Sequence, residues 1–296
     1  MKLFLKIIFR EWYNLLKNKN YRAFFRLALV YTTFNKRYRS MNLRVLGYRL
    51  LIADSLSFIW QFKEIFVDEF YCFESNTDRP IIYDCGSNIG LSCLYFKKIY
   101  PLARIKAFEA DPKICDILKT NLSQNFIKGV EVFDKAVWIN DATLFFESEG
   151  ADGGSLINSQ SNNRIEVQAI RLRTLLEKEE HVNMLKMDIE GAETAVIEDC
   201  RDLLDKIDNL FIEYHSYTSN EQELEKILMI LRENNFRYYL QAANNRKIPL
   251  INTDKEKNMD FQANIFAYQR ERKVNLERKT KPSKNKNTLE LLDSVN

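Results

Sequence analysis

The stretch from Ile81 to Leu91 constrains the fold of this chain more than any other. An apolar run, Ile81 to Tyr83, leads into Asp84, and two glycines, Gly86 and Gly90, precede an amphipathic segment. This order predicts a buried strand, a tight turn and a helix start, where open α/β sheets bind nucleotide-like ligands. We expect Gly86 to let the backbone turn sharply and approach a ligand, and Gly90 to let the helix pack closely on the strand.

Strands and helices alternate along the chain after residue 80. We expect the strands to cover residues 81–85, 104–109, 130–137, 183–187, 209–214, 236–242 and 264–269. An antiparallel excursion, residues 143–147 and 165–172, should follow the third strand. No convincing helix separates the last two strands, so the final one should run antiparallel. The pattern predicts an α/β fold with a seven-stranded doubly wound sheet.

Three segments differ in composition and suggest the domain organisation. Residues 1–75 form an N-terminal extension, residues 76–270 the main domain, and residues 271–296 a basic tail of low hydrophobicity. Within the extension we expect one strand over residues 43–53 and a helix over residues 56–70, capped by Asp54 or Ser55. In the main domain, Asp111 and Pro112 should open a helix, and Thr174 should cap a short one.

Charge is concentrated at the two ends of the chain, while the net charge is only +3. Bulk charge therefore does not favour a nucleic-acid partner. Residues 3–33 show apolar positions at helical spacing between Lys and Arg, typical of helices that pack on the main domain or on another subunit. A basic amphipathic segment within residues 1–40 that rests on an anionic membrane is the alternative. Oligomeric state is left open.

The segment at the N-terminus lacks a signal-peptide pattern, because Lys6 and Arg10 interrupt its apolar run. No apolar stretch has the length of a transmembrane helix. Five cysteines at irregular spacing, without a CxxC pair, indicate reduced, buried thiols. We therefore expect a cytoplasmic protein, with peripheral contact at the inner membrane face as the alternative.

Carboxylates follow most of the expected strands. Ligands bind at the carboxyl ends of strands in such sheets, so these side chains should meet. The residues presented there are Asp84, Gly86, Ser87, Asn88 and Gly90; Glu109 and Asp111; Asp134, Lys135 and Ala136; Asp188 and Glu190; and Glu213 and His215.

The residues of the first turn indicate which ligand binds there. Glu109 follows Gly86 at the spacing of about 20 residues at which a carboxylate binds a ribose, which suits NAD and S-adenosylmethionine alike. The turn lacks the full G-x-G-x-x-G pattern, and Asp84 would repel pyrophosphate. S-adenosylmethionine carries a sulfonium and an ammonium group, which carboxylates suit, so it is the favoured cofactor.

Four motifs, in order, resemble those of FkbM-type methyltransferases. They are Asp84–Ser92 (DCGSNIGLS), Phe108–Pro112 (FEADP), Leu185–Glu193 (LKMDIEGAE) and Ile212–His215 (IEYH). The resemblance covers roughly residues 45–270 and departs at Ala110, where the family more often has Pro. It implies a class I, Rossmann-like S-adenosylmethionine-dependent fold and O-methyl transfer to hydroxyls of sugars, glycans or related small molecules.

The resemblance also implies roles for individual residues. Asp84, Gly86, Asn88 and Glu109 would hold the cofactor, and Asp134 to Ala136 would lie near its adenine. Ser87 and Gly90 belong to the same cofactor turn.

The acceptor side is expected to contain Asp188, Glu190 and His215. A hydroxyl must lose its proton as the methyl group arrives, and these side chains are the plausible actors. The alternatives are a structural role for His215 and a favourable interaction of Glu190 with the helix dipole. We expect Glu193 and Glu213 to have supporting roles. Asp188, Glu190 and His215 together could bind a divalent metal, but hard-cation sites usually need more oxygen ligands, so no metal is expected.

Two other classes of function remain open on the sequence alone. The first is a nicotinamide-dependent oxidoreductase on the same sheet. The second is a non-catalytic binding module, which the acidic strand ends argue against because a scaffold has no use for them.

Overall fold

The computed structural model describes residues 15–33, 39–148, 154–156, 164–243, 250 and 259–269. Predictions for residues 1–14 and for the tail after residue 269 lie outside these ranges. Within them, none of the helices combines the length and apolar character that crossing a bilayer requires. All five cysteines are free thiols. Four of them are buried, as expected, but Cys72 is exposed, so the expectation is wrong for that residue.

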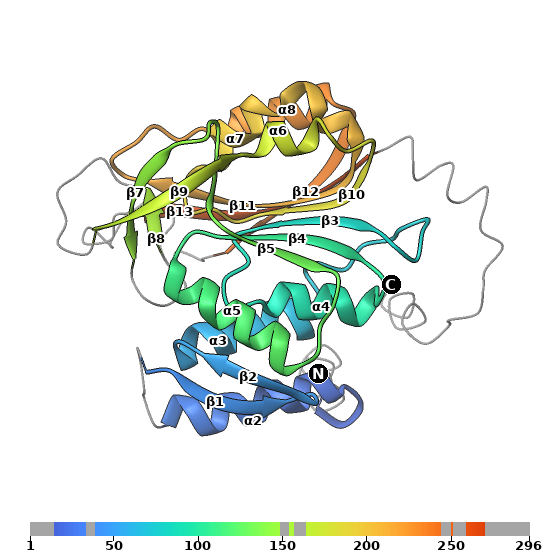
Figure 1. Cartoon of the computed structure of the whole chain (residues 1–296), viewed down its shortest axis with the longest axis vertical. Helices are drawn as coiled ribbons and strands as arrows, with labels where there is room; N and C mark the ends of the chain where they lie inside the picture. The colour runs from blue at the N-terminus through green and yellow to red at the C-terminus, as the bar shows by residue number, and fades with distance from the viewer. Residues whose placement is uncertain are drawn as a thin grey trace.

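A seven-stranded sheet forms the centre of the molecule (Figure 1). Its strands, in spatial order, are β12 (Phe236–Ala242), β13 (Met259–Gln269), β11 (Ile207–Tyr217), β10 (Val182–Met187), β3 (Ile81–Cys85), β4 (Arg104–Glu109) and β5 (Val130–Asp134). The strands from β11 to β5 are parallel, and β13 is antiparallel to both of its neighbours. The predicted doubly wound sheet with an antiparallel last strand is confirmed.

Helices cover both faces of this sheet, each over its own hydrophobic core. One face carries α4 (Leu91–Ile99) and α5 (Pro112–Gln124). The other carries α6 (Leu172–Leu176), α7 (Glu193–Asp199), the 3-10 helix η2 (Arg201–Lys206) and α8 (Leu224–Glu233). Every residue of β10 is buried, because a central parallel strand is covered on both faces.

A smaller four-stranded sheet lies beside the main one (Figure 1). Its order is β6 (Ala136–Trp138), β9 (Arg164–Arg171), β7 (Thr143–Ser148) and β8 (Gly154–Leu156). The predicted antiparallel pair is present as β7 and β9. The single strand expected over residues 130–137 is wrong: the chain leaves the main sheet after Asp134, and Ala136 begins a strand that pairs with β9.

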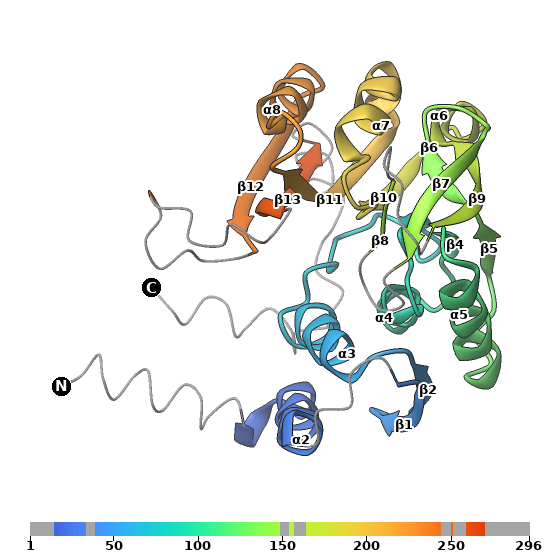
Figure 2. The same cartoon turned by 90° about the vertical axis from the view of Figure 1, so that its left-hand side faces the viewer.

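The N-terminal extension packs beneath α4 and α5 (Figure 2). It contains α2 (Lys19–Thr33), β1 (Met41–Val45), β2 (Tyr48–Ile52), α3 (Ser55–Phe62) and a π-helix, η1 (Lys63–Val67). The single strand expected over residues 43–53 is wrong. Leu46 and Gly47 both adopt positive φ, 50° and 90°, which closes a two-residue hairpin turn between β1 and β2.

Helix starts follow the capping rules at two of three predicted positions. The Asp54 carboxylate accepts hydrogen bonds from the backbone N–H groups of Leu56 and Ser57. Asp111 caps α5 in the same way, with Pro112 in the first turn. The predicted cap at Thr174 is wrong, because α6 begins at Leu172 and Thr174 lies inside it.

Asn121 on α5 joins the hairpin to the main domain. Its side chain is fully buried. Its amide oxygen accepts from the N–H of Leu51 at 2.7 Å, and its amide nitrogen donates to the carbonyls of Leu51 and Ile89, each at 2.9 Å. One side chain therefore links β2, α5 and the turn that precedes α4.

Replacement of Asn121 by Ala should lower the free energy of unfolding by about 2 kcal/mol or more, because buried backbone groups would lose their partners. Asn125→Ala is the matched control: its side chain bonds the backbone of Arg49 in an exposed setting, so it should cost less. Urea unfolding measures both. Equal losses for the two variants would contradict the role assigned to Asn121.

Candidate active site

The carboxyl ends of β3, β4, β10 and β11 meet at one edge of the sheet. The order of strands makes β3 the neighbour of both β4 and β10, so the loops after these strands lie side by side. Asp84 aligns with Ala107 on β4 and with Lys186 on β10. The fold therefore gathers most of the side chains that the sequence analysis selected.

The turn after β3 is held against the end of β4 by backbone hydrogen bonds. The N–H groups of Gly86 and Ser87 both donate to the carbonyl of Phe108, at 3.0 and 2.8 Å. The Ser87 hydroxyl donates to the carbonyl of Asp84 at 2.7 Å. Asn88 adopts a positive φ of 47°, an uncommon conformation for a side-chain-bearing residue. Hydrogen bonds within the protein therefore hold the turn in place.

Gly86 and Gly90 have positive φ values, 80° and 89°, as a sharp turn requires, and each also permits a close contact within the protein. A Cβ on Gly86 would lie 1.8 Å from the backbone oxygen of Asp188, so this glycine permits the loop after β10 to touch the turn. A Cβ on Gly90 would lie 2.6 Å from Leu118, so it permits packing on α5 and not on the strand. In each case the missing Cβ allows another part of the protein to approach the backbone closely.

Glu109 clamps two loops together. Its carboxylate accepts from the N–H of Asn88 at 2.8 Å and from the N–H of Asp111 at 2.9 Å. Burial raises the pKa of Glu109 to about 7; the two backbone hydrogen bonds lower it, Asp111 raises it and Lys186 lowers it. The carboxyl group therefore changes charge near neutral pH.

Asp84 lies beneath the turn and does not face outward. It is fully buried, and its Oδ2 accepts from the hydroxyl of Ser92 at 2.5 Å and from the thiol of Cys93 at 3.3 Å. Its Oδ1 makes no hydrogen bond within the described part of the chain and lies 3.7 Å from Nζ of Lys186. The expectation that Asp84 sits at the mouth of the site is wrong, because its strand position turns it into the core.

Lys186 is a site residue that the sequence analysis missed. Its ammonium donates to the carbonyls of Gly86 and Cys85 and lies 3.2 Å from Asp188 Oδ2. Burial alone lowers the pKa of Lys186, but Asp188 and Asp84 raise it well above its ordinary value. A lone charged residue in a buried, mostly apolar strand is the signal that could have found it, since buried charges need partners.

Asp134, Lys135 and Ala136 flank the turn region. Asp134 aligns with Glu109 across β4 and β5, is exposed, and lies 3.4 Å from Nζ of Lys119. Lys135 is half-buried, and Ala136 is buried at the start of β6. The three residues therefore lie at the same edge of the sheet as Glu109.

The loop after β10 is shaped by Glu193. Its carboxylate accepts from the N–H of Ile189 at 3.1 Å and from the N–H of Gly191 at 3.0 Å. Glu190 and Gly191 have positive φ, 56° and 98°, and the N–H of Asp188 donates to the carbonyl of Cys85 at 3.1 Å. The N-cap residue of α7 is Ala192, which makes no side-chain cap hydrogen bond. The interaction of Glu190 with the helix dipole stays a prediction.

His215 is buried beside this loop. Its Nδ1 lies 3.0 Å from Glu193 Oε1, and its Nε2 lies 3.6 Å from Glu190 Oε2 and 3.8 Å from Glu213 Oε1. Burial lowers the pKa of His215, but the carboxylates of Glu193, Glu190 and Asp188 raise it well above its ordinary value. The predicted trio of Asp188, Glu190 and His215 is thus brought together.

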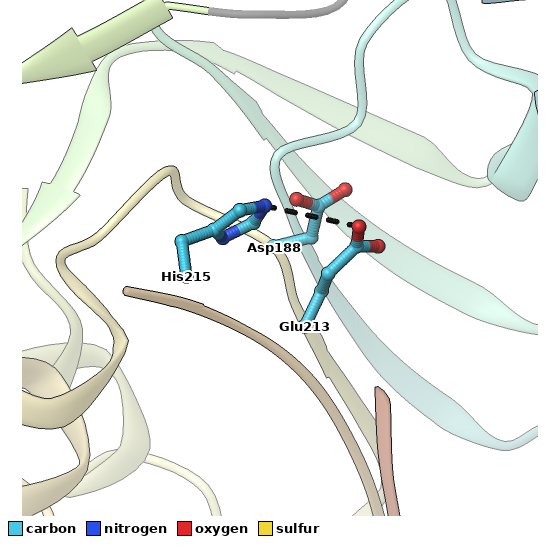
Figure 3. Close-up of side chains that lie close together, drawn as sticks. All are labelled: Asp188, Glu213 and His215. Carbon is cyan, nitrogen blue, oxygen red and sulfur yellow. Dashed lines mark ion pairs between the residues drawn. The ribbon is translucent and has the colours of Figure 1, made fainter. Parts of the chain in front are cut away.

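Glu213 joins this group, as Figure 3 shows for its side chain with those of Asp188 and His215. Residues 213 and 215 lie on one face of β11, because side chains in a strand alternate. Glu213 also accepts a hydrogen bond from the Gln262 amide of β13. Burial, then the charge of Asp188, raises the pKa of Glu213 to about 8.

Two further carboxyl groups, those of Glu190 and Glu64, interact electrostatically with Asp188. Burial raises the pKa of Glu190 to about 8, and the Glu190 carboxylate accepts from the hydroxyl of Tyr217 at 3.3 Å. Glu64, on the π-helix η1, has its pKa raised to about 7 by burial and by the charge of Asp188. The sequence analysis missed Glu64, which no motif marks; π-helical turns are frequent at functional sites.

The chain is similar in sequence to known methyltransferases. Residues 84–238 match the family model described as "Methyltransferase FkbM domain". "Methyltransferase sdnD" of Sordaria araneosa is 30% identical over 191 residues, covering 60% of this chain and 68% of that protein. "2-O-methyltransferase NoeI" of Sinorhizobium fredii is 24% identical over 165 residues, covering 49% of this chain and 67% of that protein.

Among solved structures, methyltransferase FkbM from Methylobacillus flagellatus is 15% identical and aligns with a TM-score of 0.44, covering 83% of this chain and 58% of that one. The family match spans the cofactor turn, Glu109, the loop after β10 and β11, and so includes all four motifs named from the sequence. The chain therefore belongs to the FkbM family of methyltransferases and takes S-adenosylmethionine as its methyl donor.

Proposed function

We propose that the enzyme transfers the methyl group to a hydroxyl of a sugar, a glycan or another small polyhydroxyl acceptor. The hydroxyl oxygen forms a bond to the methyl carbon while the bond from sulfur to that carbon breaks. S-adenosylhomocysteine leaves, and the hydroxyl proton passes to a protein carboxylate. A hydroxyl keeps its proton at neutral pH, so such a site needs a nearby proton acceptor.

The observation that carries this proposal is the group of Asp188, Glu190 and His215 beside the cofactor turn. The Lys186 ammonium contacts both the carboxylate of Asp188 and the carbonyl of Gly86. One side chain therefore connects the acidic group to the turn. Glu190 and His215 face each other at 3.6 Å. An acidic, partly buried group at this position suits a neutral hydroxyl acceptor that must lose a proton.

The relative named a 2-O-methyltransferase supports oxygen as the methylated atom, at 24% identity. The loop after β10 reads Met187-Asp-Ile-Glu-Gly191 and lacks the Asn/Asp-Pro-Pro-aromatic turn that holds an exocyclic amine. Both points favour a hydroxyl over a nucleobase nitrogen. A polyhydroxyl acceptor also matches a site rich in carboxylates, which accept hydrogen bonds from neighbouring hydroxyls.

For the cofactor, we propose that Glu109 accepts hydrogen bonds from the ribose hydroxyls, beside the turn of Gly86, Ser87, Asn88 and Gly90. Asp134 to Ala136 would lie toward the adenine. Asp84 supports the turn from beneath through Ser92 and Cys93. The N-terminal extension, residues 1–75, would complete the acceptor side, because the charge of Asp188, after burial, raises the pKa of Glu64 in this extension.

Affinity for S-adenosylhomocysteine should rise about tenfold between pH 6 and pH 8. The pKa of Glu109 is about 7, so only roughly a tenth of the molecules carry the carboxylate at pH 6, and apparent affinity scales with the competent fraction. Isothermal titration calorimetry at several pH values measures this. Glu109→Gln should lose most of the affinity and its pH dependence; binding retained at wild-type strength would remove Glu109 from the cofactor site.

Replacement of His215 by Ala should reduce turnover by about 100-fold or more and change cofactor affinity only slightly. His181→Ala is the matched control, since the second histidine pairs with Asp208 at the opposite ends of the strands and should leave turnover unchanged. Turnover is measured by transfer of labelled methyl groups to a panel of sugars and glycans. An unchanged rate for His215→Ala would exclude it from the reaction.

A further inference from the structure

Asp188, Glu213 and His215 have the arrangement of a ligand set for one metal ion. One donor atom of each lies within 4.8 Å of the others, and the distance from His215 Nε2 to Glu213 Oε1 is 3.8 Å. Ligands that share one hard divalent ion each lie about 2.1 Å from it, and therefore roughly 3–4 Å from one another. A small inward movement of the side chains in Figure 3 would satisfy such an ion.

The orientation of His215 supports this independently of the carboxylate cluster. Glu193, which is 1% exposed, lies 3.0 Å from Nδ1 of the imidazole, whose side chain is 2% exposed. A buried carboxylate on Nδ1 holds the proton of that nitrogen, so a metal ion that displaced the proton on Nε2 would bind the nitrogen that lies 3.8 Å from Glu213. Metal-binding histidines almost always have their second nitrogen held in this way.

Charge balance points to a cation as well. Asp188, Glu190 and Glu213 surround His215, while Lys186 lies close to Asp188 but is shared with Asp84. Buried carboxylates without compensation are costly. A divalent ion would take the place of the imidazolium charge of His215 and add one further positive charge beside these carboxyl groups.

Gln262 lies where the ion would have to bind. Its amide nitrogen donates to Glu213 and lies 3.4 Å from His215 Nε2, so the amide bridges the two ligands. Because the amide carries both a donor and an acceptor, rotation about its terminal bond would present its oxygen instead. Gln262 could then contribute a further oxygen ligand, which answers the shortage of oxygen ligands noted from the sequence.

We propose that Asp188, Glu213 and His215 bind one hard divalent cation, Mg²⁺ or Mn²⁺. Two of the three ligands are carboxylates, which, with water, suit both ions. The role of the ion rests on the proposed function: it would bind the acceptor hydroxyl, stabilise the oxyanion as the proton leaves, and orient the oxygen toward the methyl group.

The test uses the full-length, chelator-treated protein without a histidine tag. Mn²⁺ is titrated and followed by electron paramagnetic resonance, and S-adenosylhomocysteine binding is measured on the same samples. We expect one Mn²⁺ per chain in the wild type. Glu213→Gln and His215→Ala should each weaken Mn²⁺ binding at least tenfold while keeping S-adenosylhomocysteine affinity, which shows that the variants are folded.

Asp208→Asn is the matched control, because it alters the other histidine–carboxylate pair, and it should bind Mn²⁺ like the wild type. A wild type that binds S-adenosylhomocysteine but no Mn²⁺ overturns the proposal, as does unchanged Mn²⁺ affinity in Glu213→Gln and His215→Ala. The expected Mn²⁺ results support the site even if the acceptor screen finds no methylated hydroxyl, so the two proposals fail separately.

Discussion

The buried ammonium of Lys186 is the interaction on which the site depends. It lies at the centre of the sheet, donates to the carbonyls of Cys85 and Gly86, and contacts the carboxylates of Asp84 and Asp188. It therefore joins the cofactor turn of β3 to the loop after β10. Removing one member of a buried ion pair typically costs about 3–5 kcal/mol, so the two loops are strongly coupled through this one side chain.

A second organising contact, between Glu193 and His215, joins the loop after β10 to β11. Glu193 holds the backbone of the loop after β10 through Ile189 and Gly191 and reaches His215 on β11 with the same carboxylate. The loop keeps two successive residues at positive φ, including Glu190, a conformation that needs such support. The side chains around His215 are thus held by hydrogen bonds, and burial raises the pKa values of Glu190 and Glu213 among them.

Much of the main domain could be predicted, because apolar runs bounded by turn residues mark buried parallel strands and because Asp111 and Pro112 mark a helix start. The two wrong strand predictions, over residues 43–53 and 130–137, share a cause. Leu46 and Gly47 form a turn inside a continuous apolar pattern, and the chain changes sheets at Ala136; both depend on partners distant in sequence. The π-helix over residues 63–67 has no local signal, so Glu64 was missed.

The sequence by itself determined where most strands of the main sheet lie along the chain, which side chains follow their carboxyl ends, and the four family motifs. These features follow from local pattern and spacing. Only the tertiary structure decided where those side chains point. Asp84 is turned into the core by its place in β3, Gly86 is required by the backbone of Asp188, and Glu213 lies with His215 because alternate residues of a strand share a face. Strand pairing brings together groups a hundred residues apart, and no local pattern encodes the partner of a buried charge.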